Sequence, residues 1–143
     1  MLATIRSFGM WGPVVADAMV PVDVEAALVR LLGPAVGARV VTTVPNPHPG
    51  RLVRVGRIGG VRTGVVVEKP LVLVECWESS EPAAWALLQS VYAALTGAVQ
   101  TFIAPGVWLY GVSLSGGVNY PDPASTYSRY QLTAELWVRL GAA

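Results

Sequence analysis

Residues 129 to 140 alternate polar and apolar side chains more regularly than any other part of the chain. The even positions from Tyr130 to Leu140 are all apolar, whereas the odd positions are polar except for Trp137. Successive side chains of a β-strand point to opposite faces of the sheet. The segment therefore predicts a long strand with one face on the core and the other face polar, which requires a layered fold with a sheet.

Four further segments are rich in β-branched and apolar residues and are bounded by turn residues, which is typical of strands. They are residues 38–44, 51–58, 71–77 and 106–114. We expect residues 59–60, a pair of glycines, to begin the turn after the second of them. The loop at 45–50 contains three prolines, which exclude a helix there.

Two segments carry helix signals. Asp23 is a suitable N-cap for a helix that we expect to end at Gly33-Pro34. Ser79 or Ser80 can cap a second helix, which we expect to end at Gly97. Together with the five predicted strands, these two helices predict an α+β fold in which a mainly antiparallel sheet of about five strands carries two helices on one face. We assign residues 21–143 to a single domain and residues 1–20 to an N-terminal arm.

The chain is rich in apolar residues, with 53% hydrophobic and 13% charged residues, against about 25% charged in an average soluble domain. No apolar run is long enough to predict a transmembrane helix, so we expect no membrane partner. Large apolar surfaces on soluble proteins usually mark interaction sites. Composition therefore favours a protein whose surface contacts other protein.

Charge is distributed unevenly. Residues 26–67 contain no acidic residue, whereas most of the charged residues within 68–128 are acidic. This pattern fits an ordinary solvated surface, or copies of one chain that meet basic face to acidic face, as in a ring. Nucleic-acid binding is a third interpretation, but six dispersed arginines on a chain of near-neutral net charge fall short of the basic stripe of a dedicated nucleic-acid-binding protein. The candidate interface residues are Arg51, Arg54, Arg57 and Arg62 on the basic side and Glu75, Glu78 and Glu81 on the acidic side.

Two tryptophans add to these candidates, because Trp is enriched at interface hot spots. Trp85 lies off the apolar stripe of the second predicted helix, and Trp137 lies on the otherwise polar face of the last strand. Each could instead cover a flank of its own domain.

The residues that carry enzyme chemistry are scarce. Cys76 is the only cysteine and His48 the only histidine, and the strand pattern points Cys76 toward an apolar face. A zinc site needs three or four ligands of these types, and the glycines near residue 60 lack the lysine and the following helix of a phosphate loop. We therefore expect no catalytic residue, no metal and no cofactor. We expect the carboxylates of the ECWESSE segment (75–81) to serve helix capping.

Several short motifs together resemble the tail terminator proteins of long-tailed (siphovirus-type) bacteriophages, especially phages of actinobacteria. The motifs are Pro21 to Glu25, Val44 to Pro47, Arg54 to Gly60, Val74 to Trp77 with Ser79 to Leu95, and Arg129 to Thr133. The resemblance covers roughly residues 21–140.

This resemblance implies a structural virion protein, located at the head-tail junction and assembled in the host cytoplasm. Such proteins form a hexameric ring on the last ring of the tail tube, stop its polymerisation and present a surface to the head-completion (neck) proteins. The implied partners are thus other copies of the chain, the major tail tube protein and a neck protein, with genomic DNA passing through the lumen without sequence-specific binding. The alternatives are a head-closure or tail-tube subunit, or a small monomeric enzyme or ligand-binding domain.

Overall fold

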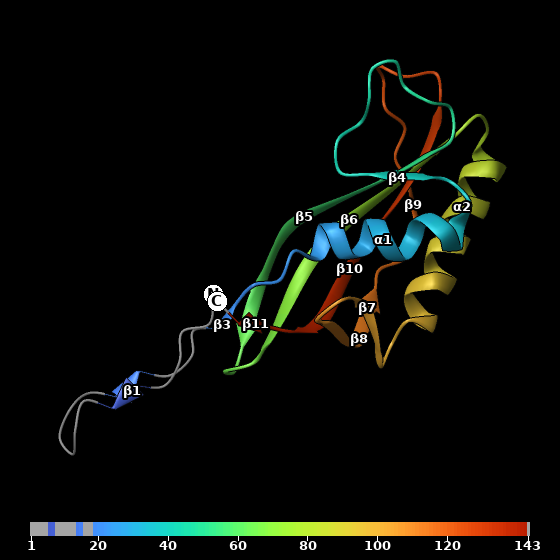
Figure 1. Cartoon of the computed structure of the whole chain (residues 1–143). Coiled ribbons are helices and arrows are strands. Elements are labelled where there is room, and N and C mark those ends of the chain that lie inside the picture. Colours follow the sequence, from blue (N-terminus) through green and yellow to red (C-terminus); the bar gives the residue numbers. More distant parts are fainter. Residues whose placement is uncertain (1–5, 8–13, 16–18, 143) are drawn as a thin grey trace.

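The protein has a mixed α+β fold with two helices and a curled sheet in its described part (Figure 1). The computed structural model describes residues 6–7, 14–15 and 19–142. The helices are α1 (Val24–Val36) and α2 (Glu81–Gly97). The strands are β1 (Arg6–Ser7), β2 (Val14–Val15), β3 (Met19–Val20), β4 (Arg39–Val41), β5 (Leu52–Thr63), β6 (Val67–Glu78), β7 (Thr101–Ala104), β8 (Val107–Leu114), β9 (Val118–Asn119), β10 (Ser128–Arg139) and β11 (Gly141–Ala142).

The main sheet has seven strands in the order β4-β5-β6-β10-β8-β7, with β9 paired to one end of β10. All its pairings are antiparallel except that of β4 with β5. The two longest pairings place β6 between β5 and β10, so β6 lies near the sheet centre, as its apolar sequence predicts. The expected mainly antiparallel sheet is confirmed, and it has two strands more than expected.

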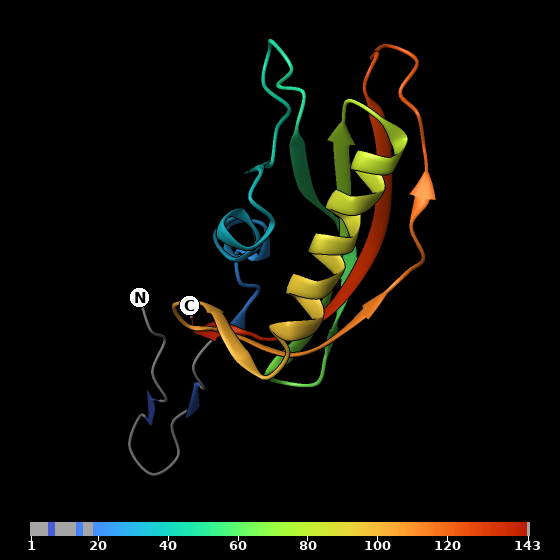
Figure 2. The ribbon, with the colours of Figure 1, turned by 90° about the vertical axis from the view of Figure 1, so that its right-hand side faces the viewer.

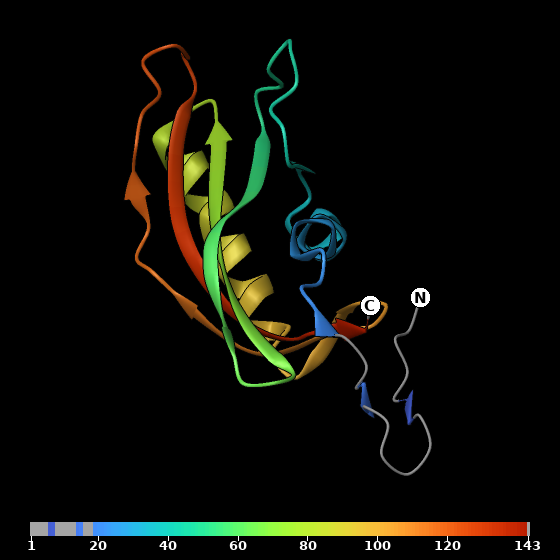
Figure 3. The same ribbon diagram turned by 90° about the vertical axis from the view of Figure 1, so that its left-hand side faces the viewer.

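The sheet is curved, and both helices pack on its concave side (Figures 2 and 3). Their buried residues, such as Leu28 of α1 and Leu88 of α2, belong to one core with Val74 of β6 and Leu136 of β10. The alternation of β10 is confirmed, because Leu132, Ala134, Leu136 and Val138 are buried and their neighbours are not.

The helix starts follow the predicted capping. The Asp23 carboxylate accepts a hydrogen bond of 3.0 Å from the Ala26 amide, and the Ser80 hydroxyl accepts one of 3.3 Å from the Ala83 amide. Such caps satisfy amide groups that have no partner within the helix. Ser80, and not Ser79, is therefore the N-cap of α2.

The expected end of α1 at Gly33-Pro34 is wrong, because the helix continues to Val36. Pro34 lies in the last turn of the helix. Its missing N–H removes one hydrogen bond, but helix ends normally fray, so the loss is tolerated there. The helix ends instead at Gly37, whose φ of 61° is left-handed. Glycine adopts this conformation without the steric cost that other residues meet.

The turn expected at Gly59-Gly60 is also displaced. β5 continues through these glycines to Thr63, and the turn lies at residues 64–66. The glycines mark a register shift between Arg57 and Gly59. A Cβ on Gly60 would lie 2.4 Å from the Lys69 carbonyl oxygen, so a glycine is needed for the close approach of β6 at this bulge.

Residues 1–20, interpreted as an arm, lie largely outside the described residues. Within them, β1 pairs with β2, and β3 pairs with β11 at the other end of the chain. The interpretation of this segment as an arm stays a prediction. Among the described residues, neither helix has the length and apolarity needed to cross a membrane.

Candidate assembly surfaces

Arg54 and Glu75, two of the predicted interface residues, lie on neighbouring strands of the same chain. Arg54 of β5 is directly opposite Glu75 of β6, and Arg129 of β10 lies close on the other side. Glu75 is buried, and its two carboxylate oxygens accept Arg54 Nη1 at 2.6 Å and Arg129 Nη1 at 3.0 Å. Two guanidinium groups thus compensate one buried carboxylate, which would otherwise be costly to bury.

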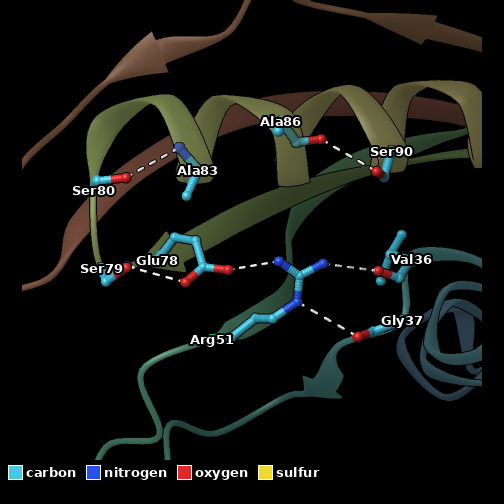
Figure 4. Close-up of polar contacts among 9 residues, drawn as sticks. All are labelled: Val36, Gly37, Arg51, Glu78, Ser79, Ser80, Ala83, Ala86 and Ser90. Carbon is cyan, nitrogen blue, oxygen red and sulfur yellow. Dashed lines mark hydrogen bonds and ion pairs between the residues drawn. The ribbon is translucent and has the colours of Figure 1, made fainter.

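A second ion pair joins the start of β5 to the end of β6 (Figure 4). Arg51 Nη1 donates to Glu78 Oε2 at 2.5 Å, and the same guanidinium donates to the carbonyl oxygens of Val36 and Gly37. The last carbonyls of a helix have no partner within it and carry partial negative charge. Arg51 therefore ties the C-terminus of α1 to the sheet.

Arg57 makes a third pair, with Glu68 near the other end of β6. Its two terminal nitrogens donate to the two Glu68 oxygens at 3.3 and 3.0 Å, and its backbone amide donates to the Glu25 carboxylate of α1. Glu68 is buried. Glu68 and Arg129 were not among the sequence candidates, and only the strand register could have identified them.

These three ion pairs change the interpretation of the uneven charge distribution along the sequence. The basic and acidic segments meet each other inside one chain, across β5 and β6, so charge complementarity between copies is not needed to explain them. Whether Arg51, Arg54, Arg57, Glu75 and Glu78 also contact another subunit stays a prediction.

Arg62 and Glu81 differ from these charges, because each is exposed and neither forms an ion pair among the described residues. Arg62 donates to the carbonyl oxygens of Met19 and Val65, and Glu81 accepts from the Asn119 amide. Both charges thus remain available to a partner of opposite sign.

The two candidate tryptophans lie on different surfaces. Trp137 lies on the convex face of the sheet, half-buried, with Lys69 Nζ 5.0 Å from its ring centroid. Trp85 projects from α2 with 41% of its surface exposed, although it also packs edge-on against Tyr130. The two residues therefore do not form one cluster.

Trp85 borders an apolar groove of about 540 Å³ between α2 and the loop that follows β8. Its lining comprises Trp85, Leu88, Gln89, Tyr92, Ala93 and Thr96 of the helix and Gly116 and Gly117 of the loop between β8 and β9. Tyr92 Oη donates to the Ser115 carbonyl oxygen, which holds this loop beside the helix. Among the residues that the structure describes, no charged side chain lines the groove.

A second apolar surface lies at the tip of the β5–β6 hairpin, which sequence reasoning missed. Val61, Val65 and Val66 are exposed there, Val65 to 74%, and Ile58 of β5 is exposed farther from the turn. Their β-branched sequence predicts strands, but it gives no sign that the hairpin extends beyond the helices that could cover it.

The geometry around Cys76 gives no support to nucleophilic catalysis. Burial, with a contribution from the neighbouring Glu75 charge, raises the pKa of Cys76 from 9.0 to about 12. His48 packs its ring against Trp77 and Tyr127. Trp77 and Cys76 are successive strand residues, whose side chains point to opposite faces, so His48 and Cys76 lie on different sides of the sheet. In the part of the chain that the structure describes, no three His, Cys, Asp or Glu side chains are grouped to hold a metal ion.

Comparisons with known proteins give a likeness in fold. No family model and no curated protein matches the sequence. The structure is similar to a chain of a solved structure described as the virion of a native gene transfer agent (GTA) particle. The likeness has a TM-score of 0.56 at 22% sequence identity and covers 80% of this chain and 93% of that chain. The chain therefore shares the fold of a virion protein over most of both lengths.

Proposed function

We propose that this chain is a structural protein of a phage-like virion, and that it forms a hexameric ring that ends the tail tube and joins it to the neck. The observation that carries the proposal is the fold likeness to a chain of the gene transfer agent virion, which covers 93% of that chain. The tail terminator resemblance of the sequence supports the same assignment.

The surface supports a role in assembly. Apolar side chains are exposed at the hairpin tip and again along α2, as the low charged fraction of 13% predicts. A ring subunit must contact a neighbour on each side as well as the tube below and the neck above. A standard interface buries about 800 Å² per partner, so four such contacts would use much of the surface of a small domain.

The proposed mechanism is steric and associative. The ring would bind the last ring of major tail tube proteins, block the surface on which a further tube ring would stack, and offer its other side to a head-completion protein. Genomic DNA would pass through the lumen without base contacts. No catalytic residue, metal or cofactor takes part, and the place of action is the virion's head-tail junction.

The candidate interface residues enter the proposal in two groups. Arg62, Glu81, Trp85 and Trp137 offer unpaired charge or accessible ring surface to a partner. The other candidates act chiefly by shaping the surface, because their charges are already paired within the chain.

Electron microscopy of the purified protein tests this function against its alternatives. A terminator should give closed rings, whereas a tail-tube subunit should polymerise into long filaments. A small ligand-binding domain, for which the groove on α2 is the supporting feature, should give separate monomers. Added to assembling tail tubes, the protein should also shorten them. Filaments or monomers would overturn the terminator assignment.

A further inference from the structure

We infer that neighbouring copies of this chain bind head to tail, with the β5–β6 hairpin tip of one copy seated in the α2 groove of the next. The inference rests on the proposed function, because it names the contact from which the ring is built. It uses two surfaces that are both present on every copy.

The groove presents an unusual helix surface to solvent. The exposed side of α2 carries Trp85, Gln89, Ala93 and Thr96, and no charged residue occurs anywhere between Glu81 and Asp122. A helix exposed to water normally carries charged residues on its outer face, whereas the polar residues here, Gln89 and Thr96, are uncharged. This face is therefore suited to contact with an apolar partner.

The hairpin tip has the complementary character. Val61 and Val65 are 61% and 74% exposed, and Val66 of the same turn is also exposed. The turn is held in place, because Arg62 donates to the Val65 carbonyl and the Leu140 amide donates to the Val66 carbonyl at 2.6 Å. A protrusion fixed in advance loses little conformational entropy when it binds.

The positions of the two surfaces favour a second copy as the occupant. Figure 1 shows α2 at the right edge of the molecule and the β5–β6 turn at the lower end of the sheet, to the left. A protrusion and a groove on separate parts of one chain cannot meet within that chain, but they can form a heterologous contact between copies, which builds rings when the rotation closes.

Charge supports the same pairing. Arg62 at the tip has no carboxylate partner among the described residues, and α2 has no basic residue in its last turn. The C-terminal end of a helix carries partial negative charge, and Thr96 places that end at the groove. Docking of the tip would bring Arg62 near it.

Two single variants and their mixture test the contact. Val65→Glu places a charge on the tip, and Ala93→Glu places one in the groove. Both positions are exposed, so neither change should disturb the core. Each variant alone should lose the ring and fall to the mass of one 15.1 kDa chain. An equimolar mixture should give dimers and nothing larger. The intact tip of the Ala93→Glu variant can bind the intact groove of the Val65→Glu variant, and the remaining tip and groove of that dimer are both altered.

Ala86→Glu is the matched control, since Ala86 is an exposed alanine of the same helix outside the groove. It should keep the wild-type mass, and circular dichroism should be unchanged in all three variants. If the wild-type chain forms rings and both single variants keep them, the tip-in-groove contact is overturned while the proposed function stands. If the wild-type chain itself is monomeric, the proposed function fails, and this contact fails with it.

Discussion

Arg54 and Glu75 form an ion pair within a single chain, with Arg54 Nη1 2.6 Å from Glu75 Oε1 across the β5–β6 pairing. Arg54→Glu should therefore lower the stability of the subunit itself, because it sets a second carboxylate beside one that is buried. Loss of one partner from a fully buried pair costs about 3–5 kcal/mol; because Arg54 is 35% exposed and Arg129 remains beside Glu75, we expect a loss at or below the lower end of that range. Urea unfolding followed by circular dichroism measures the loss.

Arg39→Glu is the control for this charge reversal. Arg39 is an exposed residue of β4 and forms no ion pair among the described residues. Its reversal should change the free energy of unfolding by less than about 0.5 kcal/mol. Equal effects of the two substitutions would show that the Arg54–Glu75 pair contributes nothing to the fold.

Gly117 packs directly against the side of the groove. A Cβ at this position would lie 2.3 Å from Leu88 Cδ2 and 2.6 Å from Trp85 Cζ3. Gly117→Ala should displace Trp85 or the loop and destabilise the protein by about 1–3 kcal/mol, as overpacking usually does. Gly116→Ala, where no atom of the described residues lies within 4 Å of the added carbon, should be close to neutral. Thermal unfolding of the two variants compares them, and a neutral Gly117→Ala would contradict the close packing.

Cys76 gives a pH-dependent prediction. Burial raises the pKa of the thiol from 9.0 to about 12, so above pH 9 the unfolded chain loses a proton that the folded chain keeps. The stabilising contribution is therefore complete below pH 9 and is lost as pH rises toward 12, by about 1.4 kcal/mol per pH unit.

Cys76→Ala isolates this effect from the other groups that titrate at high pH. The free energy of unfolding of the wild type, measured by urea titration at pH 8, 9 and 10, should fall more steeply than that of the variant above pH 9. Parallel curves for the two proteins would mean that the thiol ionises as easily in the folded chain as in the unfolded one.

Much of the fold could be predicted from local patterns. The alternation from Tyr130 to Leu140 identified β10 and its buried face, and Asp23 and the Ser79-Ser80 pair marked the helix starts, because these signals depend only on neighbouring residues. The end of α1 was wrongly predicted at Gly33-Pro34, because a proline in the last turn of a helix costs little stability. The short strands β7 and β9 were missed because their pairing with β8 and β10 is set by the tertiary fold.

The assembly surfaces were harder to predict. The charge segments around Arg54 and Glu75 suggested contacts between copies, but strand register brings these residues together within one chain. A sequence does not show which β5 residue lies opposite which β6 residue once a bulge at Gly59 shifts the register. Trp85 was identified correctly as lying off the buried stripe, whereas the exposure of Val61 and Val65 depends on how far the hairpin extends beyond the helices.

The most direct test of self-assembly is the mass of the purified wild-type chain in solution, measured by sedimentation equilibrium over a wide range of concentrations. A ring of six copies predicts a single species of six times the 15.1 kDa chain mass, present from low concentration upward. A mass of one chain at every concentration would contradict the account.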